Sequence, residues 1–318
     1  MTNGTDHPKG GVDYPRTVTE FDKWFSSEAA CEEYLRRVRW PTGFQCPACG
    51  ATRGWETRRG ELRCASCARQ TSVTAGTIFE GTRKPLRVWF QAIWYLTSQK
   101  QGVSALGLQR VLGHGSYRTS WTWLHKLRRA MVRPGRDRLT GEVEVDETFV
   151  GGPESETDGR ERLIRSMVAV AAEVRGHGIG RIRMAVVDDA SADSLIPFIQ
   201  DTVTEGSLIH TDGWAGYGPL PRYGYQHRRT SLRGTGLPPH VAMPRVHRIA
   251  SLLKRWWLGT YHGAISEPHL DYYLDEFTFR FNRRTSRSRG LLFYRLIQQA
   301  VEIEPIPYNQ LRGGKDYG

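Results

Sequence analysis

The sequence EVEVDETFV, residues 142–150, decides how the larger part of the chain is organised. Apolar and acidic residues alternate at its start, with Val143 and Val145 on one side and Glu144 and Asp146 on the other, which is the pattern of a β-strand. Gly151, Gly152 and Pro153 follow directly and end the strand. Carboxylates on a strand expected to be central indicate a function, because burying an unpaired charge is costly.

The sequences before and after this strand predict different arrangements of helices and strands. After it we expect an α/β arrangement of strands at 164–174, 181–187 and 207–210, a helix over 191–204, a long basic loop, and a helix over 246–258. Before it, polar residues 134–140 indicate a linker, and the N-terminal part predicts helices over 20–39, 86–99, 104–112 and 117–129 around a cysteine-rich ribbon at 44–72.

The second acidic position is Asp212, in the sequence HTDGW just past the short strand at 207–210. Two strand-end carboxylates on neighbouring strands can bind Mg²⁺ ions in the arrangement used for phosphoryl transfer. Taken alone, Asp146 and Asp212 each fit a turn or capping residue better than a catalytic one. The basic composition and the ribbon favour the functional interpretation.

Four of the five cysteines are spaced as C-x2-C-x14-C-x2-C: Cys46, Cys49, Cys64 and Cys67. Two such pairs joined by a hairpin predict a closed tetrahedral zinc site that stabilises a small unit. The alternative, a pair of disulfides or redox motifs, is disfavoured in a reducing cytosol. The fifth residue, Cys31, lies in a predicted helix, where packing is the ordinary role.

The overall charge points to a polyanionic partner. The 318 residues carry a net charge of +12, which suggests about two domains and favours nucleic acid, although a basic enzyme with a solvated positive face would also fit. There is no apolar stretch of eighteen residues and no secretory signal, so we expect neither a membrane partner nor export. The expected location is the bacterial cytoplasm, in association with the nucleoid.

Basic residues cluster where DNA would have to pass. No acid occurs between Asp212 and Glu267, an interval with eight Lys and Arg residues, as a phosphate backbone requires. The helix at 117–129 follows a Gly113-His114-Gly115 break and resembles the second helix of a helix-turn-helix, although an ordinary helical hairpin is an open alternative. The predicted DNA contacts are Arg118, Lys126, Arg129, Arg228, Arg229, Arg248, Arg255, Arg283 and Arg284.

Several stretches resemble the ISXO2-like transposases of the IS1595 group of insertion sequences. They are the CPACG…CASC ribbon, TIFEGTRKPL (77–86), VEVDETFVGG (143–152), HTDGWAGY (210–217) and the long motif at 246–284. The resemblance implies an RNase H-like fold, which is a mixed five-stranded sheet with flanking helices and a carboxylate triad that binds divalent metal. It makes Asp146 the first metal ligand and Asp212 the second.

The third position departs from the usual pattern. Relatives commonly have Asn-x-x-Glu ahead of a Ser-Leu-Leu-Lys run, with the Glu seven residues before the Lys. Here that Lys is Lys254 and the residue seven earlier is His247, so the chain has Asp-Asp-His with a following Lys. Residues seven apart share a helix face. His247 is then a metal ligand or proton carrier, or it marks a copy of reduced activity. Its simplest alternative role is that of a surface residue near a helix N-terminus.

The sequence therefore predicts a DDE-type DNA transposase that acts on terminal inverted repeats through Asp146, Asp212, His247 and Lys254. The expected cofactors are structural Zn²⁺ and catalytic Mg²⁺ or Mn²⁺. The expected partners are double-stranded DNA and at least one further copy of the chain. The alternatives are a catalytically impaired DNA-binding derivative and an RNase H-like nuclease. The expected domains are a mobile N-terminus (1–19), a helix with zinc ribbon (20–75), a helical DNA-binding region (76–135), the catalytic domain (141–300) and a C-terminal tail (301–318).

Overall fold

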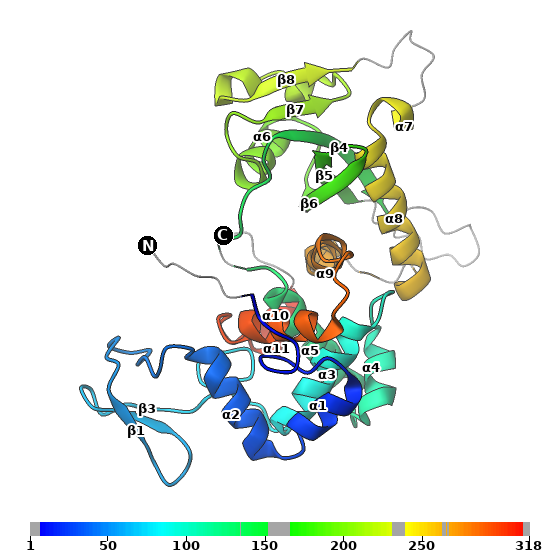
Figure 1. The fold of residues 1–318 in the computed structure, drawn as a ribbon. Helices are drawn as coiled ribbons and strands as arrows, with labels where there is room; N and C mark the ends of the chain where they lie inside the picture. Colours follow the sequence, from blue (N-terminus) through cyan, green and yellow to red (C-terminus); the bar gives the residue numbers. More distant parts are fainter. Residues whose placement is uncertain are drawn as a thin grey trace. The chain divides into compact units, whose positions relative to one another are not determined.

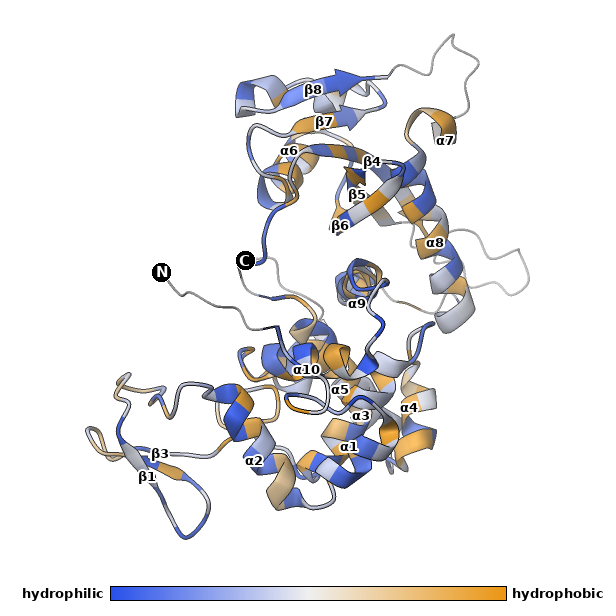
Figure 2. Ribbon diagram, viewed as in Figure 1, coloured by the Kyte–Doolittle hydropathy of each residue, from blue (hydrophilic) through white to orange (hydrophobic). Residues whose placement is uncertain are grey.

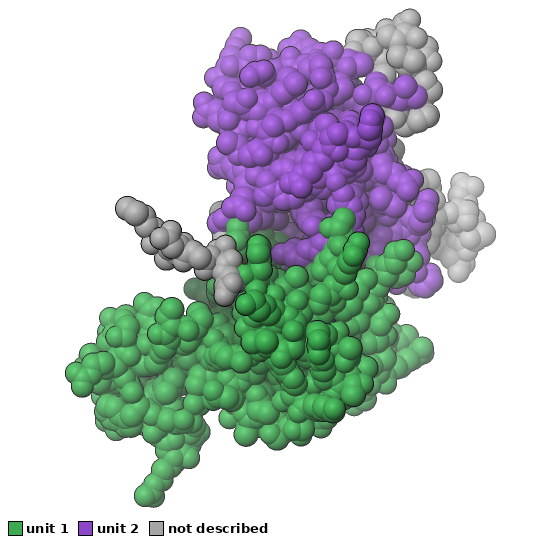
Figure 3. Space-filling model, viewed as in Figure 1, with its two compact units in different colours: residues 1–133, 285–312 green, residues 134–284, 313–318 purple. Residues whose placement is uncertain are grey.

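The computed structural model describes residues 7–133, 135–151, 166–230, 239–262, 265 and 267–313. The chain folds into two compact units (Figure 3). Unit 1 comprises Met1–Arg133 with Thr285–Arg312, and unit 2 comprises Pro134–Arg284 with Gly313–Gly318. No helix within the described residues combines the length and the apolar character that a membrane span requires.

Unit 1 begins with two helices where the sequence predicted one over 20–39. They are α1 (Val18–Trp24) and α2 (Glu28–Arg39). The break occurs because Ser27 acts as an N-cap, with its Oγ accepting a hydrogen bond from the backbone N–H of Ala30 at 3.2 Å. The remaining helices of this unit are α3 (Leu86–Ser98), α4 (Ala105–Leu112), α5 (Tyr117–Ala130), α10 (Arg289–Ala300) and α11 (Tyr308–Gly313).

An aromatic cluster holds unit 1 together across a long sequence separation. Phe293 of α10 is fully buried, and its ring lies with its centroid 5.6–6.2 Å from five other rings. These rings belong to Phe21, Phe25, Tyr34, Phe90 and Trp94. Helix α10 thereby packs against α2, α3 and α5, and its apolar face is part of the N-terminal core.

This packing corrects the predicted domain boundaries. The catalytic domain was expected to run to residue 300, but residues 285–312 belong to unit 1, and the regions 20–75 and 76–135 lie together in that unit. The described part of the predicted mobile N-terminus is also folded. The hydroxyl of Tyr34 donates to the carbonyl of Asp13 at 2.9 Å, and Tyr14 is buried beside Tyr294 of α10.

Unit 2 contains the mixed five-stranded sheet that the sequence analysis expected. The strand order is β6-β5-β4-β7-β8, with β4–β5 and β5–β6 antiparallel and β4–β7 and β7–β8 parallel. The strands are β4 (Glu142–Val150), β5 (Ser166–Arg175), β6 (Gly178–Val187), β7 (Leu208–Thr211) and β8 (Gln226–Arg229). Strand β8 lies within the stretch that we predicted to be a basic loop.

Helices cover both faces of this sheet (Figure 1). Helix α6 (Ala192–Thr202) packs on the face that bears Val143 and Val145. Helices α8 (Pro244–Tyr261) and α9 (Leu270–Asn282) pack on the face that bears Val168 and Val170 of β5. Figure 2 shows the contrast between the apolar inner strands and the hydrophilic edge strand β8. Short segments complete the unit: η1 (Ala215–Tyr217), η2 (Leu220–Tyr223), α7 (Pro239–Ala242) and η3 (Glu267–His269).

The other edge of the sheet, strand β6, is covered by side chains of α9. The Asn282 amide accepts a hydrogen bond from the backbone N–H of Ile182 at 2.8 Å and donates one to its carbonyl at 3.1 Å. Asp271 accepts from the backbone N–H of Val186 at 3.2 Å. Because an edge strand exposes unpaired backbone groups, these side chains occupy positions that a further strand would otherwise use.

Candidate active site and metal centre

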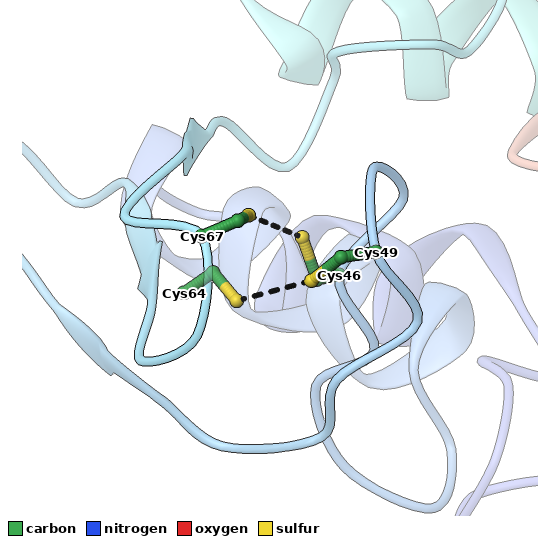
Figure 4. A group of neighbouring side chains, drawn as sticks. All are labelled: Cys46, Cys49, Cys64 and Cys67. Carbon is green, nitrogen blue, oxygen red and sulfur yellow. Dashed lines mark hydrogen bonds between the residues drawn. The ribbon is translucent and has the colours of Figure 1, made fainter.

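The four paired cysteines converge in a small three-stranded sheet of unit 1, formed by β1 (Gly54–Glu56), β2 (Leu62–Cys64) and β3 (Gln70–Thr71). Their Sγ atoms all lie within 4.8 Å of one another (Figure 4). The Cys46–Cys67 and Cys49–Cys64 sulfur pairs are each 3.6 Å apart. Tetrahedral zinc with Zn–S bonds of about 2.3 Å requires sulfurs roughly 3.8 Å apart, so the donor set fits Zn²⁺.

The local backbone also favours thiolates at this centre. The pKa of Cys64 is lowered to about 6, because the backbone N–H groups of Cys67 and Ser66 point toward its sulfur. The Ser66 N–H lies 3.4 Å from it. By contrast, Cys31 is completely buried in α2, and burial raises the pKa of its thiol to about 12. Cys31 is therefore a packing residue, as the sequence indicated.

In unit 2 one predicted aspartate, Asp146, lies on β4, and the other, Asp212, lies in the loop directly after β7. The parallel pairing of the two strands ends at Glu144 and His210, two residues before each aspartate. The pKa of Asp146 is raised to about 7, mainly by burial and further by the charges of Glu147 and Asp212. A buried carboxyl whose pKa is raised by neighbouring acids is a suitable environment for a divalent cation.

The loop that carries Asp212 is held by its own residues. The Asp212 Oδ1 accepts a hydrogen bond from the backbone N–H of Trp214 at 2.9 Å. The indole N–H of Trp214 donates in turn to the carbonyl of Ala190 at 2.7 Å. Gly216 is required beside this contact, because a Cβ there would lie 2.4 Å from the same carbonyl. The loop after β7 is thereby tied to the chain that leads into α6.

Helix α8 is attached to β4 through Glu144, which is buried. Its Oε2 accepts hydrogen bonds from the backbone N–H groups of Arg245 at 2.8 Å and Val246 at 3.1 Å. Its Oε1 accepts from the Arg245 guanidinium at 2.8 Å. The carboxylate thus satisfies the open N–H groups of the first helical turn. This attachment brings His247 to the sheet, with its Nε2 3.7 Å from Asp146 Oδ2.

Lys254 lies two turns along α8 from His247 and is exposed. The spacing places both residues on one side of the helix, as the sequence analysis expected. Arg248 and Arg255 are also exposed on this helix. The exposed surface of α8 therefore carries several cationic side chains, while the partly buried His247 imidazole lies next to Asp146.

The structure brings Asp146 and His247 into contact but does not gather the predicted catalytic ligands as tightly as the cysteines. Among the residues it describes, only the four cysteines bring three or more ligand atoms within 4.8 Å of one another. Another acid does lie beside the pair. Glu147 has a buried Oε1 without a hydrogen-bond partner, and its pKa is raised mainly by burial.

Two other acids of unit 2, Glu276 and Glu144, are engaged elsewhere. Glu276 is completely buried, and it accepts hydrogen bonds from Arg280 at 2.9 Å and from the Tyr261 hydroxyl at 3.2 Å. Glu144 is held by the start of α8. The attachment role of Glu144 was missed by sequence reasoning, although a buried acid on a central strand does signal that donors must lie nearby.

The predicted DNA contacts of unit 1 make contacts within the protein. The Lys126 Nζ donates to the carbonyl of Ile78 at 3.4 Å, and Arg129 donates to the carbonyl of Glu304 at 3.1 Å. The Arg118 guanidinium lies 3.7 Å from the centroid of the Tyr308 ring. Most of α5 beyond its first turn is buried. The part of α5 most open to a ligand is therefore its N-terminal end.

Four predicted DNA contacts of unit 2 also interact with the protein itself, and three of these four remain exposed. Arg284 donates to the Gly180 carbonyl at 3.3 Å, and Arg283 donates to the Phe279 carbonyl at 3.4 Å. Arg228 pairs with Glu142, and Arg229 donates to the His227 ring at 3.2 Å. Arg228, Arg229 and Arg284 remain exposed, so a surface role stays a prediction for them.

Comparison with known proteins identifies both parts of the chain. Residues 138–282 match the model of the ISXO2-like transposase domain of the IS1595 group. The chain carries a transposase domain of this group. Residues 26–70 match a transposase zinc-ribbon domain, and the IS1595-type domain ends within two residues of the end of the main segment of unit 2.

A relative in Halobacterium salinarum supports the same assignment. It is described as an uncharacterized protein in the transposable element ISH50, and it is 28% identical over 283 residues. The alignment covers 81% of this chain and 92% of the relative. The predicted resemblance to transposases of the IS1595 group is confirmed over residues 26–70 and 138–282, and the relative from a transposable element extends the similarity to 81% of the chain.

Proposed function

We propose that this IS1595-type chain is a DDE-type DNA transposase that cuts at the terminal inverted repeats of a mobile element and joins them to target DNA. The observation that carries the proposal is the attachment of α8 to β4. It supports the proposal because His247 Nε2 lies 3.7 Å from Asp146 Oδ2, and because the charge of Asp212 acts on Asp146. The proposed Asp-Asp-His set would draw its members from three separate parts of the sequence.

In this proposal each residue has a defined task. Asp146 and Asp212 hold divalent metal, His247 completes the constellation as a ligand or proton carrier, and Lys254 contacts a phosphate near the scissile bond. A bound Mg²⁺ or Mn²⁺ would supply charge stabilisation of the phosphoryl oxygens and of the attacking oxygen. The hydroxyl exposed by the first cut would then be held for attack on a second phosphodiester.

The substrate of the proposed enzyme is double-stranded DNA in the bacterial nucleoid. The zinc ribbon and the first turn of α5 would recognise the element ends, and the exposed cations of α8 would bind the adjoining phosphates. Joining two ends in one event requires at least two copies of the chain. We therefore propose that the active complex is a homodimer or a larger assembly.

The test is a strand-cleavage and strand-transfer assay on duplexes that contain the element ends, with Mg²⁺ or Mn²⁺. We expect Asp146→Asn and Asp212→Asn to abolish cleavage and to leave end binding unchanged, because each removes a metal ligand and no cation that binds phosphate. Equal loss of binding in both variants would show that the acids are structural. Binding without cleavage by the unaltered chain would indicate a DNA-binding derivative.

A further inference from the structure

The outer face of the zinc ribbon presents three different side chains in one row. In the antiparallel register Trp55 of β1 pairs with Arg63 of β2, and Arg63 pairs with Gln70 of β3. Directly paired residues point to the same side of a sheet. All three are exposed, and 52% of the large Trp55 side chain is open to solvent. An indole, a guanidinium and an amide therefore stand side by side.

The opposite face of the ribbon is occupied by the protein itself. Cys64 is buried at the metal centre, and a Cβ on Gly54 would lie 2.9 Å from the Phe44 ring, which packs against this face. Glu56 is held by the Arg36 guanidinium of α2, with contacts of 2.8 and 3.0 Å. The face that carries Trp55, Arg63 and Gln70 is thus the exposed face of this small sheet.

The charge around the row indicates the class of partner. Five arginines of the ribbon are exposed: Arg53, Arg58, Arg59, Arg63 and Arg69. The stretch from 53 to 69 contains two acids, Glu56 and Glu61, and the first is already paired with Arg36. An exposed aromatic ring surrounded by guanidinium groups fits a polyanion with flat, polar edges, which describes duplex DNA.

We propose that this row, Trp55–Arg63–Gln70, reads base edges in the major groove of the element end. The inference rests on the proposed function. The major groove accepts a β-ribbon. Three neighbouring strands about 4.8 Å apart span roughly 10 Å, which matches about three base-pair steps of 3.4 Å. Arg63 has the donors for guanine O6 and N7, and Gln70 has the donor and acceptor for adenine N6 and N7.

Trp55 contacts the Arg63 guanidinium and restricts its conformation. The Arg63 guanidinium carbon lies 5.8 Å from the centroid of the Trp55 ring, within the range of a cation–π contact. Such a contact restricts a long, exposed side chain before binding, which lowers the entropy lost on forming a two-pronged contact with a base. Trp55 is therefore a positioning residue for Arg63.

The experiment is selection of binding sequences from random duplexes by the full-length, zinc-loaded chain. We expect the unaltered chain to enrich a sequence that contains a G·C pair near an A·T pair. We expect Arg63→Lys to keep its affinity for non-specific duplex within about twofold, because the charge remains. On the enriched sequence it should lose about 5- to 150-fold in affinity, the value of one bidentate base contact.

Matched variants separate base reading from charge. Gln70→Ala should relax the preference at a neighbouring A·T pair, and Trp55→Ala should weaken the preference at the guanine without moving it. Arg59→Ala, in the turn between β1 and β2, should weaken binding equally for all sequences and reduce the salt slope by about 1. Zinc content of one per chain confirms that each variant keeps its ribbon.

Two results are decisive and differ in meaning. If Arg63→Lys and Gln70→Ala still select the same sequence with the same preference, the row does not read bases and the inference is overturned, while the proposed transposase function stands. If the unaltered chain enriches no sequence at all, the failure lies in the proposed recognition of element ends.

Discussion

The carboxylate of Glu144 accepts a hydrogen bond from both the backbone N–H and the guanidinium of Arg245, each at 2.8 Å. This pair connects the strand that carries Asp146 to the helix that carries His247. The Glu144 side chain is almost completely buried, with 1% of it exposed to solvent. The geometry of the candidate active site therefore depends on a contact that does not itself touch the site.

We predict that Glu144→Ala destabilises unit 2 by about 3–5 kcal/mol, because it leaves a partly buried guanidinium without its acid and the first turn of α8 without a cap. Hydrogen exchange of the full chain should show faster exchange at the first amides of α8. Glu142→Ala is the matched control on the same strand. Its partner Arg228 is half exposed, so the loss there should be about 1 kcal/mol or less. Equal effects of the two changes would contradict the attachment role.

The raised pKa of Asp146 predicts a pH-dependent stability in buffer that contains no free divalent cation. The pKa of the carboxyl is about 7 in the folded chain and near its ordinary value of 3.8 in the unfolded chain. The unfolded chain therefore releases this proton first, and the carboxyl destabilises the fold progressively from about pH 4 to above pH 7. Asp146→Asn should match the unaltered chain near pH 4 and exceed it by about 2–4 kcal/mol at pH 8. Denaturant unfolding at the two pH values measures this difference.

Addition of Mg²⁺ should reverse the destabilisation that the charged Asp146 carboxylate causes at higher pH. At pH 8 a cation bound between the carboxylates removes their repulsion, so the unaltered chain should unfold at a higher temperature in 10 mM-range Mg²⁺ than without it. Asp146→Asn should show a much smaller rise. An equal rise in the two proteins would mean that the ion acts elsewhere.

His247 is expected to set the choice of metal. A nitrogen ligand suits a transition metal better than Mg²⁺, so cleavage by the unaltered chain should be faster with Mn²⁺. His247→Glu should retain or raise the Mg²⁺-dependent rate, whereas His247→Ala should lose most activity with both ions. Cleavage assays with each ion measure the rates, and Ser251→Ala, an exposed position on the same helix, serves as the control that alters the helix surface without changing a ligand. A fully active His247→Ala protein would move attention to Glu147.

Loss of zinc should affect the ribbon selectively. Cys64→Ser removes one of four thiolates, so the protein should lose its zinc, and amides of residues 41–71 should exchange faster while those of β4–β6 are unchanged. Cys31→Ala is the control, because it removes a buried thiol outside the metal centre and should leave one zinc per chain. Metal analysis and hydrogen exchange in reducing buffer give both readouts.

The division into units predicts opposite responses to two core substitutions. Phe293→Ala removes a ring from the aromatic cluster of unit 1 and should destabilise that unit by about 3–5 kcal/mol. Phe277→Ala should do the same for unit 2, where the ring packs with α8 and the sheet. Limited proteolysis should cut residues 86–130 first in the former and residues 166–187 first in the latter. The reverse order would contradict the assignment of α10 to unit 1.

The sequence was informative wherever a local pattern matched the final environment. Residues 142–150 alternate clearly and form β4 with the predicted bounds, and the cysteine spacing predicted the metal centre. Strand β8 was missed because Gln226–Arg229 is polar and largely exposed, so it pairs through its backbone without an apolar signature.

The incorrect or missing predictions share a physical cause. Packing between segments far apart in the sequence does not change the local pattern of residues. Helix α10 has an ordinary amphipathic pattern, and its sequence does not specify whether Phe293 packs on the sheet or on the N-terminal helices. The role of Glu144 likewise depends on a helix that begins 100 residues later in the chain. The aspartates could be proposed as ligands from the sequence, but the contact between Glu144 and Arg245 that brings His247 to Asp146 could not.

The way in which α9 covers strand β6 has a consequence for synthesis of the chain. Asn282 and Asp271 emerge from the ribosome roughly eighty or more residues after β6, which at about 5–20 residues per second is a delay of several seconds. During this time the sheet has an open edge that can pair with a neighbouring nascent chain. Truncated products that end before Leu270 should therefore aggregate, and premature termination in this stretch would yield insoluble material instead of a partly active enzyme.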